Sequence, residues 1–408
     1  MPERLRSRPP PYGGPVTGRF RWVVLSAATL MQIGVSLPQQ TPAAIGPILI
    51  LSLRIDNAQL GLLTSAIWGG MLLGFIPFGL LVDRFGERPV LAGGAVLLAG
   101  ALVAASMAST FWPLFLLLIP AAIGASSGSP GGARAITEWF PRSQRGMALG
   151  IRQSGVTLAG ITAAIALPPI ALAAGWRAAF WTVAAAAVVA VAIFVVVYRE
   201  PTGGREKSAP LDPRALLSSR RFLAATAFGW VFMGVLGAAV TYLPSTLHHA
   251  AGLSVIVAAR LLAVLQLGGL VGRIGWGLIS DRAGRMPTMA VTGVLSCAAC
   301  LLMAGLGHAG TGLGILIGIA FLLGLAAMGW NALYIALAAE EVPIHHAASA
   351  IGIGTAVTFT GMLVGAPLFG LLADRSGGYQ VPWAALAGWS LLGVLFLFAG
   401  RARSTRIS

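Results

Sequence analysis

Hydrophobic residues in this chain come in long runs, not with a helical or alternating period. Runs of eighteen or more residues with almost no charge are typical of membrane-spanning helices. Backbone groups in lipid must be hydrogen-bonded within the protein, so these runs must be helical, whereas a transmembrane barrel would show alternating ten-residue segments. The pattern predicts an all-α integral membrane protein with twelve transmembrane helices. They lie near 21–51, 58–82, 89–108, 112–138, 146–173, 178–198, 222–247, 255–280, 287–307, 312–338, 348–373 and 382–400.

Composition agrees with this assignment. Of the 408 residues, 57% are hydrophobic and 10% are charged, whereas a soluble domain carries about a quarter charged residues. The first run is longer than one span needs, and we expect Pro38 and Pro42 to bend it. Cys297 and Cys300 lie inside an apolar span without further metal ligands, so we expect them to pack in the core.

The formal charge of +15 raises the possibility of a nucleic-acid partner, but its placement argues against one. Most Lys and Arg lie in short segments beside spans, and an intracellular N-terminus puts most of them on the cytoplasmic side. With this orientation, the basic residues at span ends on the opposite side of the membrane are Arg54, Arg177, Arg260 and Arg375. This asymmetry predicts that both termini are cytoplasmic. The Arg-rich composition suggests a GC-rich bacterial genome, and we expect a multi-pass protein of the bacterial cytoplasmic (inner) membrane.

The chain repeats itself once. Residues 79–89 after the second span match residues 277–287 after the eighth, and residues 138–141 match 340–343 at nearly the same spacing. The only long polar stretch lies between the two copies. We therefore predict two pseudo-symmetric six-helix bundles, as in transporters built from parallel repeats. The predicted parts are a tail at 1–20, an N-terminal bundle at 21–198, a linker at 199–221, a C-terminal bundle at 222–400 and a tail at 401–408.

Both repeated segments read G-x-x-x-D-R-x-G, and with the six-plus-six layout and the basic linker they resemble the major facilitator superfamily. The resemblance covers essentially the whole chain. Residues 145–155 and 329–334 also look similar to the cyanate/nitroimidazole-type branch. The resemblance implies the major facilitator fold and an alternating-access secondary transporter.

The resemblance also implies a gate on the cytoplasmic side. Asp83 ends a helix, where its charge is unfavourable against the helix dipole, and it would face the start of helix eleven near 347–350. Asp281 would face the start of helix five near 143–146. Arg84 or Arg88 would pair with Glu138, and Arg282 or Arg285 with Glu340 or Glu341. Glycine is expected where the loop turns or packs closely, at Gly79, Gly86, Gly277 and Gly284. Solvated loop charges are the alternative for these pairs.

Two arginines lie inside spans. Arg273 is eight residues before Asp281, so about 12 Å along a helix, and Arg152 lies at a similar depth. A charge at this depth usually faces a wet cavity, and an arginine fork suits a carboxylate. In the resembling fold spans five and eight meet, so both cations would converge on one anion, and oxalate and monocarboxylate carriers resemble the segment around Arg273. Snorkelling or bonding to helix carbonyls is the alternative.

The resemblance also places spans one, four, seven and ten around the central cavity. Their polar and aromatic residues are candidate substrate contacts, although such side chains often make helix–helix hydrogen bonds instead. Gln39 and Gln40 lie between two prolines, where a broken helix would free carbonyl groups. The candidates from these spans are Gln32, Gln39, Gln40, Ser126, Ser127, Ser129, Trp230, Tyr242, Trp330, Asn331 and Tyr334. Of these, the predicted substrate contacts are Gln39, Gln40, Trp230, Tyr242, Trp330 and Asn331, together with Arg273 and Arg152.

Several features of proton-driven relatives are absent. Pro120 stands where many members carry an arginine, the Gly-Pro signature of drug antiporters is missing from span five, and acidic residues and histidines lie in tails, loops or span ends. We therefore expect anion exchange, uniport or substrate-coupled symport of a small anionic solute. The alternatives are an exporter of neutral or hydrophobic drug-like compounds and a non-transporting membrane sensor.

The expected partners are a small-molecule substrate and the lipid bilayer, with no nucleic acid, and we expect a monomer. No nucleophile, base and orienting group can be assembled, so an enzyme is not expected. Neither a cofactor nor a metal is implied.

Overall fold

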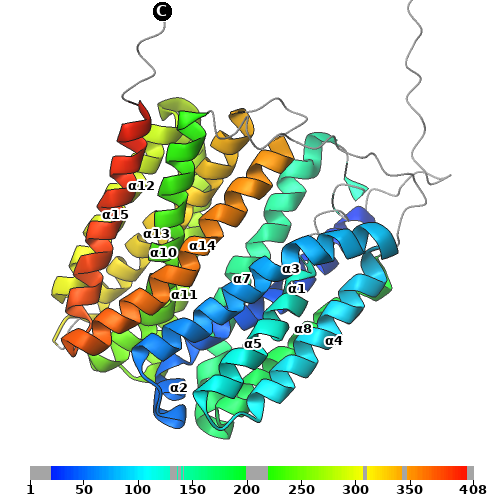
Figure 1. Ribbon diagram of the computed structural model, residues 1–408, viewed down its shortest axis with the longest axis horizontal. Coiled ribbons are helices and arrows are strands. Elements are labelled where there is room, and N and C mark those ends of the chain that lie inside the picture. Colours follow the sequence, from blue (N-terminus) through cyan, green and yellow to red (C-terminus); the bar gives the residue numbers. More distant parts are fainter. Residues whose placement is uncertain are drawn as a thin grey trace, which may run out of the picture.

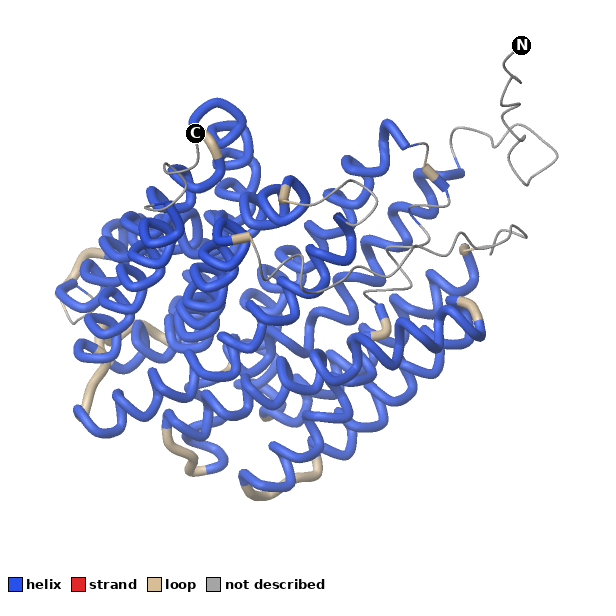
Figure 2. The backbone as a smooth tube through the Cα atoms, turned by 45° about the horizontal axis from the view of Figure 1, so that its top comes forward, coloured by secondary structure: helices blue, strands red, loops and turns tan. Residues whose placement is uncertain are grey.

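The structure is a computed structural model that describes residues 20–128, 136, 139–140, 142–198, 219–306, 310–341 and 347–401. Throughout these ranges the regular structure is helical (Figures 1 and 2). The N-terminal half contains α1 (Phe20–Ala44), α2 (Gly46–Leu53), α3 (Asn57–Phe85), α4 (Glu87–Ser106), α5 (Phe111–Ser126), α7 (Arg142–Ala174) and α8 (Trp176–Val197). The C-terminal half contains α10 (Arg220–His249), α11 (Val255–Ala283), α12 (Arg285–Leu306), α13 (Leu313–Glu340), α14 (Ala347–Ser376) and α15 (Gln380–Arg401).

Eleven helices in the described part of the chain are long and apolar enough to cross a membrane, and α5 is a shorter apolar helix of 16 residues. The predicted all-helical membrane architecture is therefore confirmed. The chain is a multi-pass membrane protein. The division into bundles at 199–221 stays a prediction, because residues 199–218 lie outside the described ranges.

The first predicted span divides into two helices, but not where its prolines suggest. α1 continues through Pro38 and Pro42 and ends at Ala44, and α2 begins at Gly46 with Pro47 in its first turn. The expectation of a broken helix between Pro38 and Pro42 is therefore wrong. Proline removes single backbone hydrogen bonds inside a helix but fits the first turn of a new one, where the missing N–H would have no partner.

Turn chemistry sets the ends of the other helices. Asp56 accepts a hydrogen bond from the backbone N–H of Gln59, whose side chain in turn accepts one from the Asp56 N–H, so α3 begins with a complete capping box. Gly86 and Gly284 both have φ of +86° at the tight turns after α3 and α11. These two positions need glycine, as the sequence predicts.

The two ends of the bundle are distinct. At the linker face, α1 and α10 begin and α8 and α15 end; the opposite end, the α2 face, contains α2 and the starts of α3 and α11 (Figure 1). Helix α3 packs on α14, and α7 packs on α11, so the halves touch along two helix pairs. Figure 1 shows α3 and α14 close together toward the α2 face and diverging toward the linker face.

Hydrogen bonds between described side chains join the halves at the α2 face and at mid-depth. The Asn57 amide donates to Asp374 at 2.8 Å, and Thr64 contacts Thr241 at 3.1 Å. Within the C-terminal half, small residues allow close helix contact, since a Cβ added at Gly272 would lie 2.4 Å from the Leu325 carbonyl oxygen. The conformation is closed at the α2 face.

Candidate functional site

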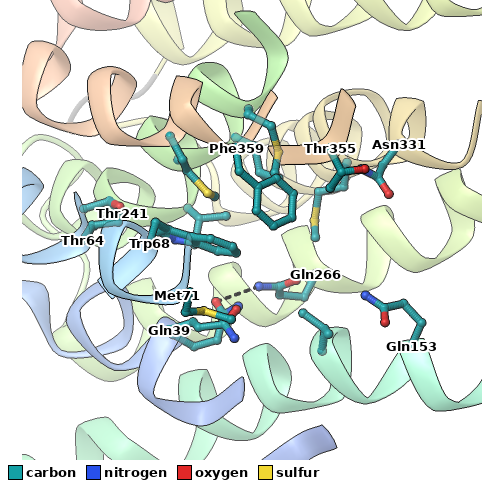
Figure 3. A pocket seen from close by; sticks show the side chains of 18 of the residues that line it. Gln39, Thr64, Trp68, Met71, Gln153, Thr241, Gln266, Asn331, Thr355 and Phe359 are labelled. Carbon is teal, nitrogen blue, oxygen red and sulfur yellow. Dashed lines mark hydrogen bonds between the residues drawn. The ribbon is translucent and has the colours of Figure 1, made fainter. Parts of the chain in front are cut away.

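A cavity of about 300 Å³ lies where the two halves meet (Figure 3). Seven membrane-spanning helices supply its described walls, namely α1, α3, α7, α10, α11, α13 and α14, so both halves contribute. This volume is at the lower end of the range for small-molecule sites. Its described lining residues are Gln32, Gln39, Gln40, Thr64, Trp68, Met71, Phe75, Gln153, Val156, Met233, Leu236, Gly237, Val240, Thr241, Gln266, Arg273, Met328, Trp330, Asn331, Thr355, Phe359 and Met362.

Arg273 carries the only formal charge among these described lining residues. It lies on α11, and its Nη1 donates to the Thr157 hydroxyl of α7 at 3.0 Å. Its Nε is buried and has no hydrogen-bond partner. The hydroxyl is neutral, so this bond leaves the guanidinium charge uncompensated, which is costly at this depth in a membrane.

Glutamine amides form the wall beside this arginine. Gln266 lies seven residues before Arg273 on α11, two helical turns away on the same face. Its Nε2 donates to Gln40 Oε1 of α1 at 3.1 Å, while its Oε1 is buried without a partner. The Trp330 Nε1 at the same cavity is also buried and unpartnered. The cavity therefore offers polar groups with unused hydrogen-bonding capacity.

The facing wall is aromatic. In Figure 3 the rings of Trp68 and Phe359 lie on the opposite side of the cavity from the Gln266 and Gln153 amides. Trp68 of α3 meets Phe359 of α14 edge-on, with ring centroids 5.4 Å apart, and Phe75 lies 6.3 Å from Phe359. Four methionines also line the cavity: Met71, Met233, Met328 and Met362.

Five of the eight predicted substrate contacts line the cavity: Arg273, Gln39, Gln40, Trp330 and Asn331. Arg152, Tyr242 and Trp230 are not among its lining residues. Arg152 is 4% exposed and donates from Nη2 to Gln32 Oε1 at 2.6 Å and to the Gly128 carbonyl at 2.7 Å. It therefore ties α7 to its own half, and the two arginines do not converge on one cavity.

Tyr242 and Trp230 lie away from the cavity, where each makes contacts with other helices. Tyr242 is buried at the α2 face, where it stacks on Phe369 and its hydroxyl donates to the Asn57 carbonyl. The Trp230 Nε1 donates to Thr360 at 3.0 Å, which joins α10 to α14 within the C-terminal half.

Sequence reasoning missed Gln266, Gln153, Trp68 and Phe359. For Gln266 a signal exists, because a polar residue two turns from an intramembrane arginine shares its helix face. Trp68 and Phe359 carry no such signal, since apolar side chains in a span face lipid and cavity alike. Within the described ranges, no three His, Cys, Asp or Glu side chains gather as a metal site would require.

The predicted gate residues are only partly described. The Asp83 side chain and Glu138 lie outside the described part of the structure, so their predicted pairs stay predictions. Arg84 packs over the Phe85 ring at 5.1 Å, and Arg88 is exposed at the start of α4. Gly79 and Gly277 lie inside helices with open space around them, so the expectation that they turn or pack closely is wrong in this conformation.

In the C-terminal half the gate residues interact with one another. Arg285 pairs with Glu340 at 3.0 Å, as the family resemblance implies, and with Asp281 at 2.6 Å. Asp281 was expected to face the start of α7 in the other half, but here its carboxylate is bonded within its own half. The divergence of the halves at the linker face accounts for this difference. Arg282 is exposed beside it, at the end of α11.

Comparisons with known proteins agree with this architecture. The chain is 28% identical over 354 residues to an uncharacterized MFS-type transporter of Mycobacterium tuberculosis, covering 84% of this chain and 78% of that one. It is 24% identical over 393 residues to the 4-hydroxybenzoate transporter PcaK of Pseudomonas putida, covering 86% and 87%. A crystal structure of a bacterial homolog of the human lysosomal transporter Spinster, inward-facing and unoccupied, superposes with a TM-score of 0.80 at 18% identity, covering 94% and 97%.

The family model of the Major Facilitator Superfamily matches residues 22–362, which is most of the chain. The two halves, packed through α3 with α14 and α7 with α11 around a cavity at their junction, fit that match. The fold, the cavity and the sequence match together show that this chain belongs to the Major Facilitator Superfamily and is a membrane transporter, not an enzyme.

Proposed function

We propose that this transporter moves a small organic anion by alternating access, with Arg273 as the counter-charge for its carboxylate. The observation that carries the proposal is the guanidinium of Arg273, the single formal charge among the described lining residues, whose buried Nε lacks a partner. A carboxylate binds an arginine through charge-assisted, often bidentate hydrogen bonds. Such a ligand would supply the charge that the neutral Thr157 hydroxyl does not.

The conformation supports this cycle. The site is closed at the α2 face, and the halves diverge toward the linker face. We infer from the basic residues beside the spans that the linker face is cytoplasmic, with both termini inside and the protein in the bacterial inner membrane as a monomer. Rocking of the halves about the cavity would then expose it to each side in turn.

Coupling follows from the lining chemistry. Among its described residues there is no Asp, Glu or His, so no side chain there exchanges a proton near neutral pH. Exchange, uniport or symport in which the substrate carries the coupled charge fits such a cavity. The gate residues Asp83, Arg84, Arg88, Glu138, Asp281, Arg282 and Glu340 would close the linker face in the alternate state.

The aromatic wall and the methionines of the lining favour one competing function, export of neutral hydrophobic compounds. The two functions differ in what they require of Arg273. Export of neutral compounds would tolerate Arg273→Gln, whereas an anion carrier would lose its ligand.

The test is a thermal-shift screen of the purified protein against carboxylates, nitrate, cyanate, neutral hydrophobic compounds and cationic drugs. A ligand that binds the folded state raises the melting temperature. Anion transport predicts a shift with one or more anions that disappears in Arg273→Gln and persists in Arg260→Gln, a matched change at an exposed arginine of the same helix. A shift with neutral or cationic compounds alone, retained in Arg273→Gln, would establish the exporter instead.

A further inference from the structure

Beyond anion transport, the cavity indicates the class of anion, and this inference rests on the proposed function. A single guanidinium is the only formal charge among the described lining residues, so a ligand with two carboxylates would leave one without a counter-charge. An uncompensated charge away from water is strongly unfavourable. The lining therefore selects a monoanion.

The body of the ligand must match the facing wall. Trp68, Phe75 and Phe359 supply ring faces and edges there, and the four methionines around the cavity supply polarizable thioethers. Aromatic groups interact with such rings through edge-to-face contacts, and thioether sulfur also packs well on rings. A flat aromatic body uses this wall better than a saturated or hydroxylated chain does.

The far end of the ligand has a polar partner. Gln266 lies about 10 Å along α11 from Arg273, and one atom of its buried amide has no partner. A polar substituent on the ring, opposite the carboxylate, would satisfy that amide and remove the cost of leaving it unpaired. We propose that the substrate is an aromatic monocarboxylate, with its carboxylate on Arg273, its ring against Trp68 and Phe359, and a polar substituent directed to Gln266.

The test measures uptake of radiolabelled benzoate into proteoliposomes and its competition by unlabelled acids. We expect 4-hydroxybenzoate to compete best. Cyclohexanecarboxylate, which lacks the aromatic ring, should be about threefold to tenfold weaker than benzoate. Terephthalate, with a second carboxylate, should compete at least tenfold more weakly than benzoate. Gln266→Leu should make benzoate and 4-hydroxybenzoate equal, and Trp68→Leu should remove the preference for benzoate over cyclohexanecarboxylate.

The outcomes separate this inference from the proposed function. Arg273-dependent transport of aliphatic or inorganic anions, with no preference for aromatic acids, would overturn the aromatic class and leave anion transport standing. Transport of no anion at all would overturn both. Variants are compared by initial rates per folded protein from size-exclusion chromatography, so that a folding defect is not mistaken for lost selectivity.

A second, independent observation concerns the α2 face. The motif G-x-x-x-D-R-x-G occurs a third time, in residues 370–377 at the end of α14. Asp374 of this copy reaches the other half: its Oδ1 accepts hydrogen bonds from the Asn57 N–H at 3.1 Å and the Asn57 side chain at 2.8 Å, and its Oδ2 accepts one from the Ala58 N–H at 2.8 Å. The carboxylate thus caps the start of α3, where helix dipole and free N–H groups both favour a negative charge.

Further contacts join the end of α14 to the start of α3. The Tyr379 hydroxyl donates to Asn57 Oδ1 at 2.8 Å, and burial together with the nearby Asp374 carboxylate raises the pKa of Tyr379 above its ordinary value, so it stays a donor. A Cβ added at Gly370 would lie 2.4 Å from the Asn57 carbonyl oxygen, whereas the matching glycines of the first two copies, Gly79 and Gly277, have open space. The third copy is therefore packed at the junction of the halves in this conformation.

We propose that Asp374 is a latch that closes the α2 face and must break when the transporter opens there. The test is maleimide labelling of Ser65→Cys in detergent-purified protein, because Ser65 lies at the same junction and donates to the Leu363 carbonyl. Asp374→Asn should raise the labelling rate at least about fivefold. Asp281→Asn, the same change in a copy at the linker face, should not raise it.

Gly370→Ala is the second variant, and by wedging the junction it should raise labelling in the same direction. Unchanged labelling in Asp374→Asn, with a melting temperature equal to that of the parent, would overturn the latch. So would an equal rise in Asp281→Asn.

Discussion

Arg152 and Arg273 both lie inside membrane-spanning helices of the described chain, and their surroundings differ. Arg152 in the N-terminal half is buried against Gln32 and the Gly128 carbonyl, all within its own half. Arg273 in the C-terminal half lines the cavity and reaches across the junction to Thr157, with its Nε unpartnered. A charged side chain deep in the membrane needs polar or charged partners. The partners seen in the structure show whether the protein supplies them or leaves them to a ligand.

The largest expected effect comes from removing the charge at the cavity. Arg273→Gln keeps a hydrogen-bonding side chain but loses the positive charge, so the dissociation constant for the transported anion should rise at least about a hundredfold. Arg273→Lys should recover part of this loss, because an ammonium keeps the charge but not the planar fork. Isothermal titration of the purified protein measures both. Equal anion affinity in wild type and Arg273→Gln would show that Arg273, like Arg152, does not bind the substrate.

The second effect concerns stability. Arg152→Leu leaves the Gln32 and Gly128 oxygens without this donor, so the free energy of unfolding should fall by about 1–3 kcal/mol for each buried acceptor left unsatisfied. Thermal melts in detergent measure the loss as a lower melting temperature. Anion affinity of the folded fraction should stay within about twofold of wild type. A large loss of affinity without loss of stability would place Arg152 in the site.

The smallest effect comes from the bond that Arg273 makes across the junction. Thr157→Val removes the hydroxyl that competes with a ligand for the guanidinium, so anion affinity should improve about threefold. Serine at this position keeps the hydroxyl and is the matched control. Weaker binding in the valine variant would mean that Thr157 itself contacts the substrate.

Much of the fold follows from the sequence because lipid imposes a simple constraint. Each long apolar run must be a helix, and the duplicated motif after spans two and eight indicates paired halves. The helix break at Ile45 could not be predicted from the sequence in the same way. Proline is expected to break a helix, yet α1 continues through both Pro38 and Pro42. Where a helix ends depends on packing at the α2 face as well as on local residues.

From the sequence, a residue of the site can be predicted only where its burial in the membrane is energetically unfavourable without a specific partner. Arg273 is identifiable because a charge inside a span demands a reason. The fate of Arg152 depends on how α1, α5 and α7 pack, which no local pattern reports. Trp68 and Phe359 become a cavity wall only because α3 and α14 of different halves approach one another, and apolar residues in spans look alike whether they face lipid, core or ligand.

One transport assay compares the two arginines directly. Proteoliposomes containing wild type, Arg273→Gln or Arg152→Gln are loaded with unlabelled benzoate, and counterflow of radiolabelled benzoate is followed. We expect counterflow to be abolished in Arg273→Gln and retained in Arg152→Gln when rates are expressed per folded protein. Retained counterflow in Arg273→Gln, or its loss in Arg152→Gln alone, would contradict the assignment of Arg273 as the substrate's counter-charge.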